Sequence, residues 1–356
     1  MLTTIVVLSV FTLVVVVHEL GHLIVCRMLG VRVEKFSVGF GRELFGFDWK
    51  GVHWSFAILP LGGYVKPAGE DSDERSGAPD EFFSQPWHGR ILIALAGPVM
   101  NYALAFLCFF WILFYWGVAE PSNEPVIGEV VSGYPAQAAG FFKGDRILAV
   151  NGKPIHTWEE AAGEIHTKAG TAIDIRYERS TEAGPVEKIA ALVPKKDPRR
   201  GIGLIGISPD IRMVPQGAGE AARSSWKQCV DLSVLTLGYL GGALKKSILN
   251  RAKPELELAG PIGIVTIIAN VFREGLQAMV SLVALISLNL GLFNLFPIPL
   301  LDGGHVFLYT LEGLFRKPLN KTAVRAANIA GATFLITVFL FATTQDLTRL
   351  KTIFFK

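Results

Sequence analysis

The stretch L-V-V-V-V-H-E-L-G-H-L-I-V, residues 13–25, places three ionisable side chains inside an otherwise apolar run. Residues four apart share one face of a helix, so His18 and His22 can offer two imidazoles to one metal ion while Glu19 handles a proton. A charged group near the middle of a membrane helix costs about 2.5 to 3.5 kcal/mol, so such groups are functional by default. The stretch predicts a metal site in a membrane helix; the alternative is two histidines that merely hydrogen-bond to neighbouring helices.

The composition is that of a membrane protein. Of 356 residues, 51% are hydrophobic and only 18% are charged. The net charge is +3 and no basic block alternates with aromatic residues, so nucleic acid is not an expected partner. Cys26, Cys108 and Cys229 lie in separate apolar segments without C-x-x-C spacing. This predicts packing roles for the cysteines, with neither disulfides nor a metal knuckle.

Four uncharged stretches are long enough to cross a bilayer, which takes about 17 to 25 residues. They are residues 1–17, 91–119, 276–301 and 326–345. No Lys or Arg precedes the first stretch and no small-x-small cleavage site follows it, so we expect a retained anchor and not a signal peptide.

Basic residues predict the orientation of these spans. Those at positions 27–35 follow the first span and none precedes it, so the N-terminus is expected outside. The basic loop at 316–321 then also falls inside, whereas the basic C-terminal residues 349–356 point the other way. Because early spans usually dominate topology, both termini and the long segment 120–275 are predicted to lie outside.

The outer segment has two parts. Short β runs at 126–131, 147–150 and 173–177, with a helical stretch at 158–166, predict a compact soluble domain. Two apolar stretches at 232–244 and 259–272 are too short to span; they predict helices on the outer leaflet, or alternatively helices packed on the soluble domain.

The inner segment also has two parts. Residues 31–66 alternate apolar and polar side chains between glycines, which predicts hairpins. Residues 70–81 are acidic and carry Ser, Gly and Pro, which predicts a solvated loop.

A hydrolytic zinc site needs three protein ligands and one open position for water. The third span runs in the same direction as the first and reaches its inner end in N-L-F-P-I-P-L-L-D-G-G, residues 294–304. Asp302 should therefore lie at the level of His18 and His22. Pro297 and Pro299 are expected to break the helix there.

Two alternatives to this ligand stay open. Asp302 could be a cap at an ordinary span end, since Asp with Gly is common turn chemistry. His305 could be the third ligand instead, but a turn expected at Gly303 and Gly304 makes it the weaker candidate. The other histidines are expected to be ordinary surface or core residues: His53, His88, His156 and His166.

H-E-L-G-H in a first span and L-D-G in a later one together resemble the site-2 protease family of intramembrane zinc metalloproteases, in its bacterial RseP-like branch. Further marks of the branch extend the resemblance over most of the chain. They are G-F-G at 39–41, G-G-Y-V-K at 62–66, A-G-P at 96–98 with Asn101, G-P-I-G at 260–263, and N-x-x-P-x-P-x-x-D-G from Asn294.

The resemblance implies that His18, His22 and Asp302 hold Zn²⁺ and that Glu19 is the general base. Asn294 would position the substrate or stabilise the oxyanion. The glycine-rich hairpins would re-enter the membrane, where an unwound substrate could pair as an added strand. The implied reaction is hydrolysis within or near the transmembrane segments of single-pass proteins, such as anti-sigma factors or remnant signal peptides.

Residues 134–152, Y-P-A-Q-A-A-G-F-F-K-G-D-R-I-L-A-V-N-G, resemble part of a PDZ domain. Such domains bind chain ends by strand addition, which implies a peptide ligand; the alternative is a fold kept as a lid or spacer. One PDZ-like unit is present, whereas the best-known member of the branch has two in tandem.

The expected fold is a multi-pass α-helical membrane protein with four transmembrane helices, a membrane-associated β-hairpin region and an inserted PDZ-like α+β domain. We divide it into a first catalytic half at 1–119, the PDZ-like domain at 120–212, interfacial helices at 213–275 and a second catalytic half at 276–356. The resemblance implies a bacterial inner membrane, with the termini and PDZ-like domain periplasmic and the active site near the cytoplasmic side.

Three competing functions are weighed against this one. They are a membrane metallopeptidase that cuts loops, a non-catalytic scaffold that binds partners through its PDZ-like domain, and a transporter. The transporter is disfavoured because the spans show no inverted repeat.

Overall fold

A computed structural model describes residues 2–70, 75–182, 184–198, 200–250, 260–317 and 319–354. The chain divides into two compact units. Met1–Phe114 and Gly217–Lys356 form what we call the membrane unit, and Tyr115–Gln216 form the inserted unit. Helices α5 and α6, from the segment predicted as interfacial, thus belong to the same compact unit as the spans.

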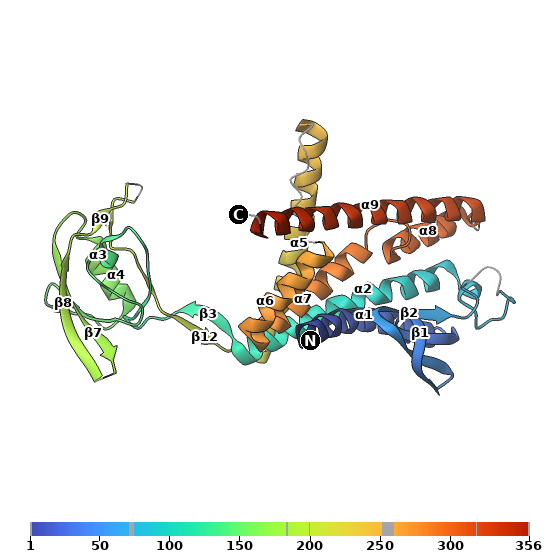
Figure 1. Cartoon of the computed structure of the whole chain (residues 1–356), viewed down its shortest axis with the longest axis horizontal. Coiled ribbons are helices and arrows are strands. Elements are labelled where there is room, and N and C mark those ends of the chain that lie inside the picture. Colours follow the sequence, from blue (N-terminus) through green and yellow to red (C-terminus); the bar gives the residue numbers. More distant parts are fainter. Residues whose placement is uncertain are drawn as a thin grey trace. The chain divides into compact units, whose positions relative to one another are not determined.

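Among the described residues, four helices are long and apolar enough to cross a membrane. They are α1 (Leu2–Met28), α2 (Trp87–Trp111, continued by a π-helical turn over Ile112–Trp116), α7 (Leu276–Asn294) and α9 (Lys321–Phe354). A helix of spanning length is therefore found at each of the four predicted spans (Figure 1).

The predicted end of the third span is wrong. Helix α7 stops at Asn294, and residues 295–301 form turns where the prediction continued the span. Pro297 and Pro299 have no N–H to donate to a helix, and Leu300 has a positive φ of 78°. Helix α8 (Asp302–Phe315) begins directly after this break.

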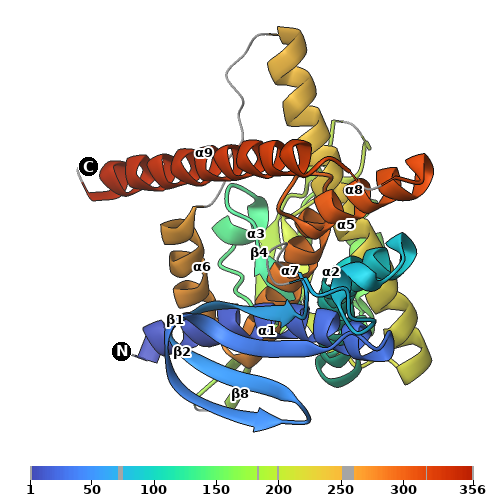
Figure 2. The same cartoon turned by 90° about the vertical axis from the view of Figure 1, so that its right-hand side faces the viewer.

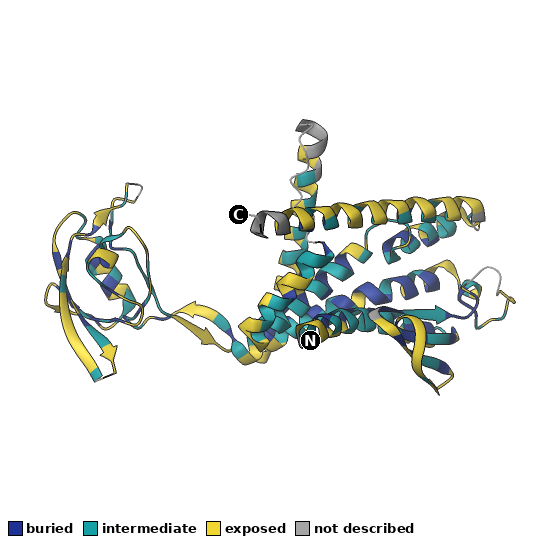
Figure 3. Cartoon of the chain, in the orientation of Figure 1, coloured by how far each residue is buried: buried dark blue, intermediate teal, exposed yellow. Residues whose placement is uncertain are grey.

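Helix α2 is the centre of the membrane unit and contacts α1, α5, α7 and α8. Glycines allow the close approach of its neighbours. A Cβ added to Gly21 of α1 would lie 2.3 Å from the carbonyl oxygen of Ala96, and one added to Gly291 of α7 would lie 3.0 Å from that of Pro98. Figure 3 shows α2 buried along much of its length, whereas α9 is largely exposed.

The predicted hairpins are present as two long strands, β1 (Val33–Trp49) and β2 (Val52–Pro67), which lie beside α1 (Figure 2). Each strand folds across its middle. Phe36 therefore pairs with both Val65 and Trp54, and Trp54 pairs also with Phe47. The bends occur at Gly39, Gly41 and Gly62, all with positive φ. Residues 63–67 thereby form one edge of the sheet.

The acidic loop at 70–81 is only partly as predicted, and its residues 71–74 lie outside the described part. Residues 75–77 are exposed, but Glu81 is buried and accepts hydrogen bonds from the backbone N–H groups of Ser76 (2.8 Å) and Gly77 (3.0 Å). The prediction of a solvated loop is wrong at this end, because the chain folds around a buried carboxylate.

The two short apolar stretches belong to longer elements, α5 (Ala218–Asn250) and α6 (Pro261–Glu274); position 259 of the prediction lies outside the described residues. Helix α5 packs on the spans α2 and α7. The hydroxyl of Ser233 lies 3.0 Å from that of Tyr102, and the hydroxyl of Thr236 donates to Asn289. Helix α5 is therefore packed on the spans of its own unit.

The G-P-I-G motif is explained by a cap on α6. The backbone N–H groups of Gly260 and Gly263 donate to the buried carboxylate of Asp346 on α9, at 3.1 and 2.8 Å. A Cβ at Gly260 would lie 2.5 Å from that carboxylate. The motif therefore joins α6 to α9.

The inserted unit is built on a four-stranded sheet in the order β6-β5-β7-β8. The predicted strands and helix are found, and β8 and several short strands were missed. The elements are β3 (Val118–Pro121), β4 (Ile127–Val130), α3 (Pro135–Ala138), β5 (Arg146–Val150), β6 (Lys153–Pro154), α4 (Trp158–His166), β7 (Ile173–Thr181), β8 (Gly184–Leu192), β9 (Lys195–Lys196), β10 (Gly203–Leu204), β11 (Ile207–Pro209) and β12 (Ile211–Val214). Its core includes Ile127, Ile147 and Ile175.

Candidate metal centre

Two helices bring the three predicted ligands together. His18 and His22 lie one turn apart on α1, and Asp302 is the first residue of α8. Nε2 of His18 lies 3.2 Å from Nε2 of His22 and 3.1 Å from Oδ2 of Asp302, while Nε2 of His22 lies 3.5 Å from Oδ1 of Asp302. Among the described residues, these three form a group whose ligand atoms all lie within 4.8 Å of one another.

These distances fit a zinc ion. Tetrahedral coordination with bonds of about 2.0 to 2.1 Å places neighbouring ligand atoms about 3.3 Å apart, close to the separations found here. Oδ2 of Asp302 is buried and takes part in no hydrogen bond, although the His18 nitrogen is near. A buried carboxylate oxygen without a hydrogen bond is costly unless a cation meets it. The donor set of two imidazoles and one carboxylate is also one that zinc uses.

The path of the chain after Asp302 differs from the prediction. A turn was expected at Gly303 and Gly304, but both lie inside α8. Added Cβ atoms there would lie 2.2 Å from the carbonyl oxygens of Leu295 and Ile298 respectively. The two glycines therefore let the start of α8 pack against residues 295–301, which link α7 to α8. This packing directs Asp302 toward α1.

His305 lies one helical turn beyond Asp302 and outside the three-residue group. Its ring stacks on Tyr309, with centroids 5.9 Å apart, and both side chains line the same cavity as the histidine pair. Burial lowers the pKa of His305, against a smaller raising effect of Asp302. His305 therefore lies near the metal group without completing it.

Glu19 lines the same cavity as the metal group and is hydrogen-bonded to the sheet. Its Oε2 accepts a hydrogen bond of 3.1 Å from the backbone N–H of Val65, in the edge segment 63–67. The carboxylate is held at a defined place in the cavity, one residue from a ligand on the chain.

Asn294 is the last residue of α7, and its Nδ2 lies 3.5 Å from Nε2 of His18. The end of α7 caused by the proline-rich break thus places a side-chain amide at the metal group.

Helix α2 contributes groups that sequence reasoning left without a role. Nδ1 of His22 lies 2.8 Å from the carbonyl oxygen of Ile93, and Nδ1 of His18 lies 3.2 Å from the side-chain amide of Asn101. Gly97 lies between them. The spacing of 93, 97 and 101 puts all three on one helix face, a signal that A-G-P with Asn101 already contains.

Gly97 leaves the space that the two imidazoles occupy. A Cβ added there would lie 2.4 Å from Nε2 of His22 and 2.6 Å from Cε1 of His18.

We expect Gly97→Ala to lower zinc affinity at least about tenfold, because the rings must move out of ligand geometry, and outer-shell disturbances alone cost 10- to 100-fold. Alanine favours a helix by about 1 kcal/mol over glycine, so α2 itself is not weakened. Competition with a chromophoric chelator measures the affinity. The control is Gly238→Ala on α5, where an added Cβ meets nothing within 4 Å. Equal affinities for the two variants would contradict the packing argument.

The metal group opens into a cavity of about 280 Å³ within the membrane unit. Its lining includes residues of α1, α2, β2, α7 and α8 and of segment 295–301, among them Glu19, Glu70, Phe82, Asn294 and Leu301. Outside the cavity, Arg90 of α2 and Glu312 of α8 form an ion pair at 2.7 Å that is mostly shielded from solvent. This pair anchors the helix that carries Asp302 to the centre of the unit.

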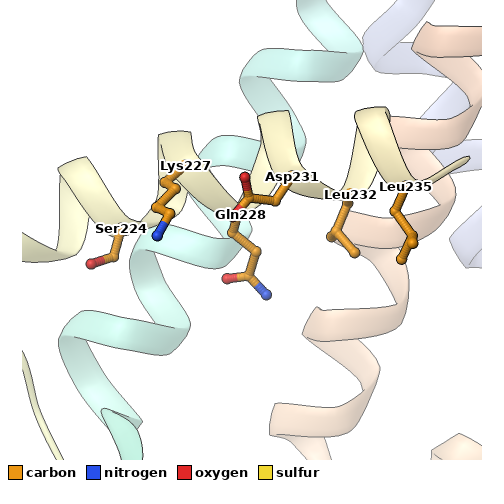
Figure 4. A pocket seen from close by; sticks show the side chains of 6 residues that line it. All are labelled: Ser224, Lys227, Gln228, Asp231, Leu232 and Leu235. Carbon is orange, nitrogen blue, oxygen red and sulfur yellow. The ribbon is translucent and has the colours of Figure 1, made fainter. Parts of the chain in front are cut away.

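Another hollow of about 280 Å³ lies along α5, away from this chemistry. Figure 4 shows its side chains on successive turns of α5, beside α2 and α7; they are Ser224, Lys227, Gln228, Asp231, Leu232 and Leu235. It contains no histidine or cysteine and offers a single carboxylate, so it lacks a metal-binding set.

The sequence profile of Peptidase family M50 matches residues 6–338. The chain belongs to peptidase family M50. This M50 protein is a zinc metalloprotease, and the family is membrane-embedded, which agrees with the four apolar helices. The predicted membership of the site-2 protease family is confirmed.

Relatives of similar length support the assignment. Two of them bear the name "Putative zinc metalloprotease": one from Clostridium acetobutylicum is 31% identical over 94% of this chain and 94% of its own, and one from Agrobacterium fabrum is 31% identical over 96% and 94%. Metalloprotease MmpA of Caulobacter vibrioides is 31% identical over 96% of this chain and 94% of its own.

Among solved structures, the PDZ domain of an SdrC-like protein from Listeria monocytogenes aligns with 26% of this chain and 93% of its own length. The identity is 23% and the TM-score 0.21. The PDZ-like character of the inserted unit stays a prediction.

Proposed function

We propose that this M50 protease hydrolyses peptide bonds within or near the membrane-spanning segments of single-pass proteins, at a zinc ion held by His18, His22 and Asp302. The observation that carries the proposal is the convergence of these three ligands inside a unit built from membrane spans. A metal site at this place can reach a peptide bond that an enzyme of the aqueous phase cannot.

Each residue then has a chemical role. Zinc, when bound, supplies an acidic water and a Lewis acid for the scissile carbonyl. Glu19 takes the proton of the attacking water and returns it to the leaving nitrogen. The side-chain amide of Asn294, 3.5 Å from the His18 ligand nitrogen, donates to the carbonyl oxygen as negative charge develops there.

The sheet edge supports a mode of substrate binding. Peptide bonds in a helix are shielded by the helix's own hydrogen bonds, so a substrate must be unwound before it is attacked. Segment 63–67 is an edge of the sheet, and the N–H of Val65 points out from it to Glu19. A substrate added as a strand along this edge would lie extended beside the catalytic carboxylate.

A reconstituted assay tests the proposal. The full-length protein in liposomes is given a single-span substrate, and the products are mapped by mass spectrometry. We expect a cut within the span or next to it, lost with 1,10-phenanthroline and restored by zinc. Glycine or proline placed near the cut should raise the rate, because it unwinds the helix. A cut confined to a distant loop would favour the loop-cutting metallopeptidase instead.

We propose further that the protein lies in a bacterial inner membrane with its termini and inserted unit periplasmic and its active site near the cytoplasmic side. In the inserted unit, a cavity of about 330 Å³ between α4 and residues 203–207 would take a peptide end or serve only as part of a size filter. The rival function, a non-catalytic scaffold, would require a protein without stoichiometric zinc.

A further inference from the structure

Asn101 is a fully buried polar residue next to the metal group. It lies on α2 with no exposed surface, and its Nδ2 is 3.2 Å from Nδ1 of His18. Its Oδ1 is also buried and has no hydrogen-bond partner. An amide in this position needs an explanation, because a buried polar side chain costs free energy unless it is hydrogen-bonded.

The chemistry of a histidine ligand supplies one. An imidazole that gives Nε2 to a metal carries its proton on Nδ1, and that N–H needs an acceptor. An amide nitrogen is a donor and cannot serve, whereas the amide oxygen can. A 180° rotation of the amide exchanges the two atoms. Because Oδ1 makes no other hydrogen bond, the rotation gives up no bond on that side.

His22 shows the same arrangement with no ambiguity. Its Nδ1 lies 2.8 Å from the carbonyl oxygen of Ile93, which can only accept. The proton of His22 is therefore on Nδ1, and its Nε2 is available to the metal. Helix α2 would thus present an oxygen to each histidine, two helical turns apart, from Ile93 and from Asn101.

The backbone around Asn101 holds the amide in place. The main-chain carbonyl oxygen of Asn101 accepts a hydrogen bond of 2.9 Å from the hydroxyl of Ser287, which is itself fully buried on α7. Gly291 of α7 allows a close approach, since an added Cβ there would lie 3.1 Å from the Cβ of Asn101.

We propose that Asn101 is a positioning residue of the metal site, whose side-chain oxygen accepts the Nδ1 proton of His18 and so keeps Nε2 directed at the metal. The inference rests on the proposed ligand set, and it assigns a task to the second span, which contributes no ligand.

The test compares two substitutions in the full-length protein in detergent. Asn101→Asp keeps an acceptor of the same shape, and Asn101→Leu removes it. We expect Asn101→Asp to bind zinc within about threefold of the parent protein and Asn101→Leu to bind 10- to 100-fold more weakly, the usual cost of losing an outer partner of a ligand. Asn289→Leu on α7 is the matched control, because its amide bonds to the carbonyl of Leu285 and not to a histidine.

Spectroscopy separates positioning from a general loss of structure. Long-range ¹⁵N correlation spectra of the zinc-loaded parent should show His18 protonated at Nδ1, and Co²⁺ absorption should be kept in Asn101→Asp. If Asn101→Leu does not fold, the Asn101→Asp variant still tests the inference. Aspartate cannot donate a hydrogen bond, so if the amide acted as a donor to His18, Asn101→Asp would bind zinc at least tenfold more weakly.

Three results would each overturn the inference. They are a zinc affinity of Asn101→Leu equal to that of the parent, failure of Asn101→Asp to bind zinc, and a His18 proton on Nε2. The ligand set itself would stand as long as the parent binds zinc and Asp302→Ala does not. A parent protein without zinc would overturn both proposals.

Discussion

Glu19→Gln is expected to lower peptide-bond cleavage by about 10²- to 10⁴-fold while the protein keeps its zinc. Glutamine has the size of glutamate, and its side-chain oxygen can still accept the hydrogen bond from Val65. It cannot take a proton from water. Since general acid–base catalysis contributes about 10²- to 10⁴-fold, cleavage of a single-span substrate should fall by that factor.

The measurement pairs a cleavage assay with zinc analysis of the same preparation. Glu70→Gln is the matched control, because it removes another carboxylate that lines the cavity but lies apart from the metal group. It should keep cleavage within a few-fold. Substantial cleavage by Glu19→Gln would mean that another group accepts the proton, and the proposed mechanism would fail.

Asp302→Ala is expected to lose zinc, and cleavage with it. The substitution removes the single carboxylate of the ligand set and leaves two histidines on one helix. Even outer partners of ligands contribute 10- to 100-fold to metal affinity, so loss of a ligand should weaken binding by more than about 100-fold. Metal content after dialysis against a weak chelator measures this directly.

Two controls identify what the carboxylate does. Asp346→Ala removes another buried aspartate of the membrane unit, one that caps α6, and should keep zinc even if the protein is less stable. His305→Ala tests the competing ligand and should also keep zinc. If Asp302→Ala kept the metal and His305→Ala lost it, the third ligand would be His305 and the geometry described here would not be the working one.

Local sequence was sufficient for much of the fold. The four spans follow from run lengths alone, since a bilayer demands a fixed length of apolar helix. Helix α4 and the strands at 127–130 and 146–150 follow from short-range periodicity and turn residues. The predictions failed where contacts with residues distant along the chain or in a loop set the local structure. Helix α8 passes through Gly303 and Gly304 because these glycines pack on residues 295–299. Glu81 is buried because residues 76 and 77 fold around it.

The sequence by itself was enough to predict a metal site: a helix with two imidazoles and a carboxylate in an apolar run, and an aspartate that follows a distant span. Both features follow from local rules, namely the spacing of residues on a helix and the length of helix that a bilayer requires. Only the tertiary structure decided how these groups are held, with the oxygens of Ile93 and Asn101 behind the histidines, the space at Gly97, and Val65 against Glu19. Those contacts join residues 46 to 83 positions apart, and their geometry depends on how helices and strands pack, which no local pattern encodes.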